Sequence, residues 1–185
     1  MNILALSGSL RAGSINSALL RAAARLAPAG MRVEVFAGIG DLPLFNFDLE
    51  ALPPAPVRRL REAVAGSSAL VIASPEYAHG ISGVMKNTLD WLVSLEAFFG
   101  KPVAILNAQP RAHLADAALR ETLRTMSACI VESASVGIAL DAKTLTEDGM
   151  LASSQVSGTI SSALDALRAA VLNGVFSNGP AFPIG

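Results

Sequence analysis

Apolar runs and amphipathic stretches alternate along most of the chain. Three runs are apolar almost without interruption, as in strands buried on both faces, and they predict strands over residues 1–7, 69–74 and 102–107. Two further runs with more polar residues predict strands over residues 32–36 and 130–136. Between them, apolar residues recur at helical spacing, which predicts helices over residues 14–27, 57–65, 83–95, 112–128 and 153–172. This order indicates repeated βα units around a parallel sheet, and therefore the α/β class.

Five strands and five helices in 185 residues predict a doubly wound, five-stranded parallel sheet of strand order 2-1-3-4-5 in a three-layer αβα arrangement. We expect one domain over residues 1–174 and a tail over 175–185. The longest predicted loop, 37–54, contains three prolines. Ligands of such sheets bind beyond the carboxyl ends of the strands, near the point where the strand order reverses. The candidate binding loops are therefore those at 8–14, 75–83 and 107–111.

Composition and charge exclude several classes of function. A formal net charge of −1 and a pI of about 6.1 give no basic surface for nucleic acid or an anionic membrane. The apolar runs are shorter than the roughly 20 residues that span a bilayer. Residues 1–10 lack the basic start and the small-residue cleavage site of a signal peptide. We therefore expect a cytoplasmic protein with neither membrane nor nucleic-acid partners.

The cysteine and histidine content argues against a metal site. Cys129 is the only cysteine, which excludes a disulfide within the chain and a cysteine-based metal cluster. Because it lies among apolar residues, we interpret it as a buried structural thiol rather than a redox nucleophile. His79 and His113 have no further ligating residues at metal-binding spacing. We predict no metal.

The first loop, residues 8–14, is rich in glycine and hydroxyl groups and leads directly into a helix. Amide N–H groups at the start of a helix are unpaired and carry about half a positive charge, so they attract anions. Ser9, Ser14 and Asn16 add hydrogen-bonding groups, and Arg11 adds a fixed positive charge. The segment predicts a site for a terminal phosphate. Alternatively, Ser14 is an ordinary N-cap and the glycines serve only a tight turn.

Other phosphate-binding motifs do not fit this segment. The Gly-Lys-Ser/Thr of a P-loop and the Gly-x-Gly-x-x-Gly of a dinucleotide site are both missing from it. A magnesium-dependent phosphoacceptor site is disfavoured, because the first strand ends in Ser7 and Gly8 without an acidic cluster. A monophosphate is the ligand that fits.

The second loop combines an aromatic side chain with glycines that allow backbone to approach a ligand closely. Pro75 ends the strand. A flavin needs a flat slot and hydrogen bonds to its ring edge, and this loop supplies both, with Tyr77 as the wall. Alternatively, Tyr77 is a half-buried ring whose hydroxyl reaches water, and His79 is either a substrate contact or a surface residue. The third loop, 107–111, is predicted to add amides at the ring edge.

Together, the first two loops resemble a known family. Gly8-Ser9-x-Arg11-x-x-Ser14-x-Asn16 precedes Pro75-Glu76-Tyr77, which leads to Gly83-Val84-Met85-Lys86-Asn87-Thr88-Leu89-Asp90-Trp91. In this order and on these elements, the motifs resemble those of the NADPH-dependent FMN reductase family. That family has a flavodoxin-like fold and includes flavin, quinone, azo-dye and chromate reductases. The resemblance covers nearly the whole chain.

The resemblance implies an FMN-dependent NAD(P)H oxidoreductase. NADPH or NADH would pass hydride to N5 of bound FMN, and a small acceptor such as free flavin or a quinone would take the electrons. No side chain is assigned a catalytic role. The implied cofactor-binding residues are Ser9, Arg11, Ser14, Ile15, Asn16, Pro75, Glu76, Tyr77, Ala78, His79, Gly80 and Asn107.

The chain departs from the family pattern in the second and third loops. Ala78 stands where many members have Asn, Ser82 where many have Pro, and residues 107–111 replace a glycine-rich segment. The resemblance also implies a homodimer or homotetramer, with helix 83–95 as the candidate surface. Two alternatives remain open, an electron carrier that docks protein partners and a flavin-free binding or regulatory protein. Carriers of this fold are usually strongly acidic, and this chain is not.

Overall fold

A parallel sheet lies at the centre of the protein, which a computed structural model describes over residues 1–111 and 113–174. Its main strands are β1 (Asn2–Ser7), β2 (Arg32–Val35), β3 (Ala69–Ala73), β6 (Pro102–Asn107) and β7 (Cys129–Ile130). They pair in the order β2-β1-β3-β6-β7, and every pairing is parallel. Counted along the chain, this order is 2-1-3-4-5, so the predicted sheet is confirmed.

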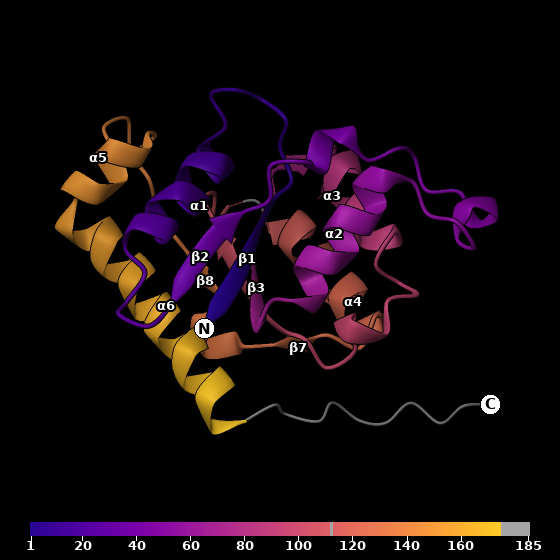
Figure 1. Ribbon diagram of the computed structural model, residues 1–185. Helices are drawn as coiled ribbons and strands as arrows, with labels where there is room; N and C mark the ends of the chain where they lie inside the picture. The colour runs from indigo at the N-terminus through magenta and orange to yellow at the C-terminus, as the bar shows by residue number, and fades with distance from the viewer. Residues whose placement is uncertain (112, 175–185) are drawn as a thin grey trace.

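Helices form a layer on each side of this sheet (Figure 1). One layer contains α1 (Ile15–Arg25), α5 (Glu147–Ala152) and α6 (Ser154–Asn173). The other contains α2 (Ala55–Ala65), α3 (Gly83–Asp90) and α4 (His113–Thr125). The protein therefore has the three-layer, flavodoxin-like architecture expected from its sequence.

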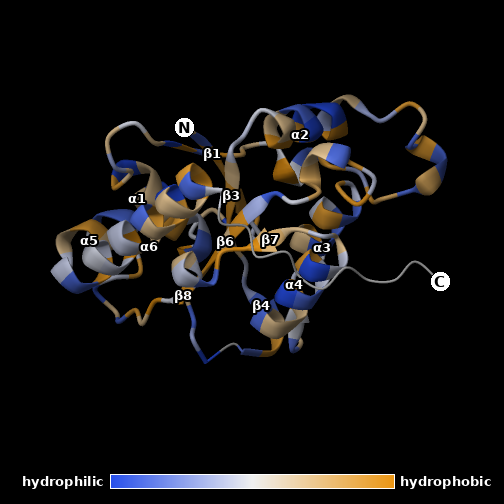
Figure 2. Cartoon of the chain, turned by 90° about the horizontal axis from the view of Figure 1, so that it is seen from below, coloured by the Kyte–Doolittle hydropathy of each residue, from blue (hydrophilic) through white to orange (hydrophobic). Residues whose placement is uncertain are grey.

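Alternate residues of the central strands pack against opposite helix layers. In β1, Ile3 and Ala5 belong to the core shared with α1 and α6, whereas Leu4 and Leu6 belong to the core shared with α2 and α3. Figure 2 shows the strands as an apolar centre between helices that are polar on their outer sides. Because both faces are covered, β3 is apolar and buried at every position, whereas the edge strand β2 alternates exposed charged residues with Val33 and Val35.

The predicted strand over 130–136 is divided in the structure. β7 ends at Ile130, the 3₁₀ turn η4 (Glu132–Ala134) follows, and the short strand β8 (Val136–Gly137) then pairs with β6. Ser135 accounts for the interruption, because its Oγ accepts a hydrogen bond from the Ile105 amide at 3.1 Å and donates one to the Val131 carbonyl at 3.0 Å. A side chain thus replaces strand pairing at this point.

The helix predicted over 83–95 is shorter than expected, since α3 ends at Asp90. Trp91 and Leu92 follow it, and both are fully buried in the core on this side of the sheet. The 3₁₀ turn η3 (Glu96–Phe98) completes the connection to β6. The apolar residues of this segment therefore pack mainly inward, with Val93 and Phe99 as exposed exceptions.

The structure also contains two elements that the hydrophobic pattern does not predict. They are the hairpin of β4 (Glu76–Tyr77) with β5 (Gly80–Ile81) and the short helix α5. Residue 112, the predicted start of the fourth helix, and the predicted tail 175–185 lie outside the described residues.

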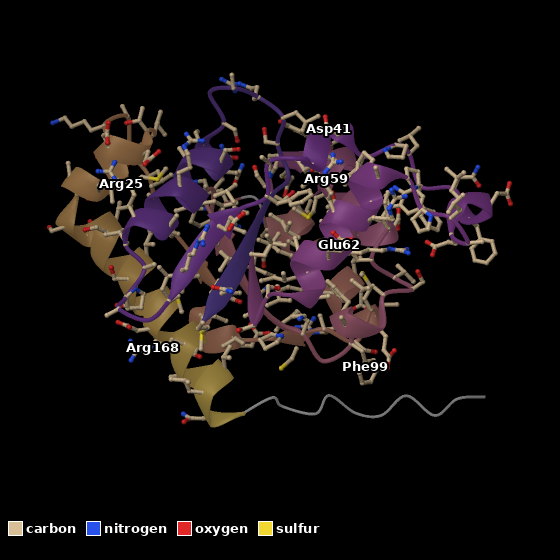
Figure 3. All side chains as sticks on the ribbon, viewed as in Figure 1. Arg25, Asp41, Arg59, Glu62, Phe99 and Arg168 are labelled. Atoms are coloured by element: carbon tan, nitrogen blue, oxygen red, sulfur yellow. The ribbon has the colours of Figure 1, made fainter. Side chains whose placement is uncertain are left out.

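Residues 42–54 form an arm that projects beyond α2 and α3, with apolar stretches along it (Figure 1 and Figure 2). The 3₁₀ turn η1 (Ile39–Asp41) precedes the arm and η2 (Phe47–Leu49) lies within it. At its base, Asp41 Oδ2 lies 3.9 Å from Arg59 Nη2 of α2 (Figure 3). The longest predicted loop is therefore an ordered projection.

Within the described residues, no helix is long and apolar enough to cross a bilayer. The same residues contain no group of three or more His, Cys, Asp or Glu side chains able to hold a metal ion. Cys129 is buried with a free thiol, in agreement with its interpretation as a structural residue.

Candidate functional site

Three loops meet at the carboxyl ends of β1, β3 and β6, which are neighbours in the sheet. The Gly8 amide donates to the Ala73 carbonyl at 2.8 Å, so the first loop leaves β1 directly beside the end of β3. Ser74, after β3, and Asn107, at the end of β6, line one small cavity under α4. The loops singled out from the sequence therefore lie side by side at the reversal of strand order, where ligands of this architecture bind.

The first loop is shaped by hydrogen bonds between its own residues. The Ser14 amide donates to the Arg11 carbonyl at 3.0 Å, and the Arg11 amide donates to Ser9 Oγ at 3.4 Å. Ser14 is the N-cap of α1, since its Oγ accepts from the Ser17 amide at 3.2 Å. The N-cap interpretation of Ser14 is thus correct, and it leaves other groups of this segment free to bind a ligand.

Hydrogen-bond donors without partners gather at this helix start. Over residues 1–111 and 113–174, the amides of Ile15 and Asn16 have no hydrogen-bond acceptor, as expected for the first turn of a helix. In the same described part of the chain, no carboxylate lies within 4.0 Å of the exposed Arg11 guanidinium. The side chains of Ser9 and Asn16 are buried beside them. Such a set of donors and positive charge suits an anion such as a phosphate.

Ser82 joins the first loop to the second. Its Oγ donates to the Gly8 carbonyl at 2.7 Å and accepts from the Met85 amide at 3.2 Å, so it also caps α3. Ser74 Oγ lies 3.4 Å from the same hydroxyl. Ser82 is almost completely buried, at 1% exposure. Ser82, which stands where many family members have Pro, therefore has a structural role as an N-cap. Its position three residues before Met85, at the start of a predicted helix, is the sequence signal for that role.

The second loop is a hairpin rather than an irregular segment. Glu76 pairs with Ile81 and Tyr77 with Gly80, and the two residues between them, Ala78 and His79, have φ angles of 49° and 61°. Two consecutive positive φ angles are characteristic of a type I′ turn, which usually contains Asn or Gly. The Tyr77 side chain is exposed, at 56%. The hairpin thus presents an exposed aromatic ring, on a turn strained by non-glycine residues, and Ser82 connects its end to the first loop.

The Glu76 carboxylate is directed to the start of α4. Its Oε2 accepts from the Ala115 amide at 2.9 Å, and its Oε1 lies 3.3 Å from Nδ1 of the exposed His79. The Ala115 N–H is the main cause that holds the pKa of Glu76 below its usual value; partial burial opposes this effect, and His79 and the Leu114 amide add to it. Glu76 is therefore an ionised link between the hairpin and α4.

The third loop is fixed by the sheet and by its own side chain. Asn107 Oδ1 accepts from the Gln109 amide at 2.8 Å, which forms an Asx turn. The Asn107 carbonyl accepts from the Ile138 amide at 2.8 Å, just after β8. Beyond this turn, Gln109, Pro110 and Arg111 are exposed. The loop therefore offers an exposed rim beside the hairpin.

The structure brings all the sequence-predicted site residues to one edge of the sheet, although their local surroundings differ. Ser9, Ser14 and Asn16 are buried, whereas Arg11, Tyr77, Ala78 and His79 are exposed. The residues that sequence reasoning missed are Ser74 and Ser82 and the start of α4, which all contact the predicted loops. The doubly wound parallel sheet with helices on both faces gives this protein a flavodoxin-like fold.

This chain belongs to the NADPH-dependent FMN reductase family, whose family model matches residues 1–143. An NAD(P)H-dependent FMN reductase of Pseudomonas aeruginosa is 47% identical over 112 residues, which are 58% of this chain and 60% of that protein. A quinone reductase of Escherichia coli is 38% identical over 109 residues, 57% of this chain and 58% of that protein. The matched segment thus spans about three fifths of these relatives.

Solved structures give the same fold over more of the chain. The flavoenzyme NAD(P)H:(acceptor) oxidoreductase FerB of Paracoccus denitrificans has a TM-score of 0.76 and 27% identity, covering 91% of this chain and 97% of that one. The apo form of the NADH:FMN oxidoreductase EmoB has a TM-score of 0.67 and 22% identity, covering 97% and 91%. The second comparison supports the fold alone.

The close contact between the first two loops predicts that Gly8→Ala destabilises the protein by about 1–3 kcal/mol. A Cβ atom at Gly8 would lie 2.3 Å from Ser74 Oγ and 2.8 Å from Ser74 Cβ. The measurement is the free energy of unfolding in urea. Gly158→Ala in α6 is the matched control, because nothing lies within 4 Å of its new Cβ, and it should stabilise by up to about 1 kcal/mol. Equal effects of the two substitutions would contradict this description of the junction.

Proposed function

We propose that this protein is an FMN-dependent NAD(P)H oxidoreductase that passes electrons to a small acceptor. The observation that carries the proposal is the set of free donors at the start of α1, with Arg11 beside them, next to an exposed aromatic hairpin. The printed names of the relatives, an FMN reductase and a quinone reductase, support the same class of reaction and suggest free flavin or a quinone as acceptor.

The residues present suit the two chemically different parts of FMN. The phosphate would be held by the amides of Ile15 and Asn16 and by the side chains of Ser9, Arg11 and Ser14, since these groups offer donors and positive charge. The ring would lie against the hairpin and the third loop, at Pro75, Glu76, Tyr77, Ala78, His79, Gly80 and Asn107. Ser14 can donate its hydroxyl hydrogen to the phosphate, because the hydrogen bond that caps α1 uses only a lone pair of its Oγ.

When bound, FMN supplies a ring that accepts a hydride from NAD(P)H and gives electrons to an acceptor. The chain's own contribution is binding and orientation, so no side chain needs to be a general acid or base. The exposed hairpin leaves small molecules access from solvent to the residues proposed to line the ring. The cytoplasm, where NAD(P)H is available, is the proposed location.

The phosphate assignment predicts that Arg11→Ala weakens FMN binding by about tenfold or more, since a hydrogen bond from a charged group is lost. The dissociation constant is measured by titrating apoprotein with FMN and following the flavin fluorescence. Arg168→Ala is the matched control, because Arg168 lies on α6, away from the first loop (Figure 3), and donates a hydrogen bond to the Ala29 carbonyl at 3.4 Å. Unchanged affinity in Arg11→Ala would remove Arg11 from the phosphate site.

We also propose that the 42–54 arm contacts a second copy of the chain in a homodimer or homotetramer. Along its length the arm exposes Leu44, Phe47 and Leu52, each about 80% accessible to solvent. Its base is held firmly, because Asn87 bonds to the Phe45 amide at 2.8 Å and to the Pro43 carbonyl at 3.0 Å. An anchored projection with exposed apolar side chains suits burial against another molecule.

Three further contacts hold the arm in place. Trp91 Nε1 donates to the Pro43 carbonyl at 2.8 Å, and the Phe45 ring meets the Trp91 ring edge-on with centroids 5.0 Å apart. Farther along, Arg61 pairs with Glu50 at 2.8 Å. The arm, rather than α3 itself, is therefore the proposed contact surface, and a two-fold symmetric pair would bury both copies of it.

The arm's role predicts that the triple variant Leu44→Ser, Phe47→Ser, Leu52→Ser has a smaller mass in solution than the parent protein. Apolar contacts between copies would be lost while the anchors at Asn87 and Trp91 remain. The measurement is size-exclusion chromatography with light scattering. Leu172→Ser, which changes an exposed side chain near the end of α6, serves as the control and should keep the mass of the parent protein. A monomeric parent protein, or an unchanged mass in the triple variant, would contradict the proposal that the arm is a contact surface between copies of the chain.

A further inference from the structure

The hairpin that carries Tyr77 has little to hold it in place by itself. Its two strands contribute only two residue pairs, Glu76 with Ile81 and Tyr77 with Gly80. Its turn holds Ala78 and His79 at positive φ, which is unfavourable for residues with a Cβ atom. A two-stranded hairpin is marginally stable in water even with longer strands. Contacts outside the hairpin must therefore fix its position.

Glu76 provides such a contact from within the hairpin. Its side chain is only 16% exposed, and Oε2 accepts from the Ala115 amide in the first turn of α4 at 2.9 Å. The hydrogen-bonded residues are 39 positions apart in sequence, so this bond ties two separate elements together. A carboxylate at a helix start satisfies an amide that has no partner within the helix and is favoured by the helix dipole.

The other carboxylate oxygen of Glu76 braces the turn. Oε1 lies 3.3 Å from His79 Nδ1, so one side chain contacts both the strained turn and α4. The remainder of α4 is fixed independently of the hairpin, because Leu119 and Leu123 are buried in the core and Arg120 pairs with Glu132 of η4 at 2.5 Å. The helix is therefore a rigid support to which the hairpin is attached.

We infer that Glu76 is a positioning residue that fixes the Tyr77 hairpin on α4 through its carboxylate. The functional consequence of this attachment rests on the proposed function: the position of the hairpin would set how the nicotinamide of NAD(P)H approaches the flavin ring. The attachment itself is a property of the flavin-free protein. The side chain of Glu76 acts through α4, and its backbone remains free to line the ring.

The first test is hydrogen exchange of the flavin-free protein. In Glu76→Ala, the Ala115 amide and the hairpin amides exchange about tenfold faster, because the bond to the helix start is lost. Glu76→Gln keeps a neutral acceptor and recovers part of the protection. Glu121→Ala, an exposed carboxylate farther along α4, is the matched control and leaves these amides unchanged. Amides of β3 serve as the reference for global stability.

The second test uses the FMN-loaded enzyme. In Glu76→Ala, kcat/KM for NADPH falls about tenfold, Glu76→Gln restores most of it, and Glu121→Ala retains the parent value. Unchanged amide exchange in Glu76→Ala would overturn the inference. Protection of these amides that depends on Glu76 only when FMN is bound would also overturn it, because it would indicate a direct contact between Glu76 and the flavin ring. If the parent protein binds no FMN, the proposed function fails, and the exchange experiment still decides the role of Glu76.

Discussion

The close approach of the first loop to the end of β3 is the constraint on which the site depends. Gly8 bonds to Ala73 through its amide and to Ser82 through its carbonyl, and Ser74 leaves no space for a side chain at Gly8. The parallel register of β1 with β3 brings these residues together. The start of α1 and the start of α3 are thus locked to one edge of the sheet by backbone hydrogen bonds and buried hydroxyls.

This arrangement separates rigid support from exposed binding groups. The hydrophobic cores on the two sides of the sheet hold the strands and helices together. The loops at the ends of the strands are therefore held in fixed positions. Serine hydroxyls and the Glu76 carboxylate link one loop to the next element, while Arg11 and Tyr77 remain exposed. A cofactor proposed to span the first loop and the hairpin would meet a surface that is largely preformed, which lowers the entropic cost of binding.

The sequence predicted the parts of this protein that depend on burial and on local chemistry. Apolar runs such as 69–74 identified the strands because both of their faces are covered, and Ser14 was identifiable as an N-cap from its place before a helix. The β4–β5 hairpin was not predictable, since its strands have two residues each and its turn holds Ala78 where Asn or Gly is expected. The bond from Glu76 to Ala115 depends on tertiary folding, so no local pattern reveals it.

The most direct test of the central claim is the visible spectrum of the protein after incubation with FMN, removal of the excess and anaerobic addition of NADPH. A flavin band that stays with the protein and bleaches on addition of NADPH is the result expected of an FMN-dependent reductase. A retained band that neither NADPH nor NADH bleaches would contradict the claim in favour of an electron carrier. A protein that retains no flavin would contradict it in favour of a flavin-free relative with the same fold.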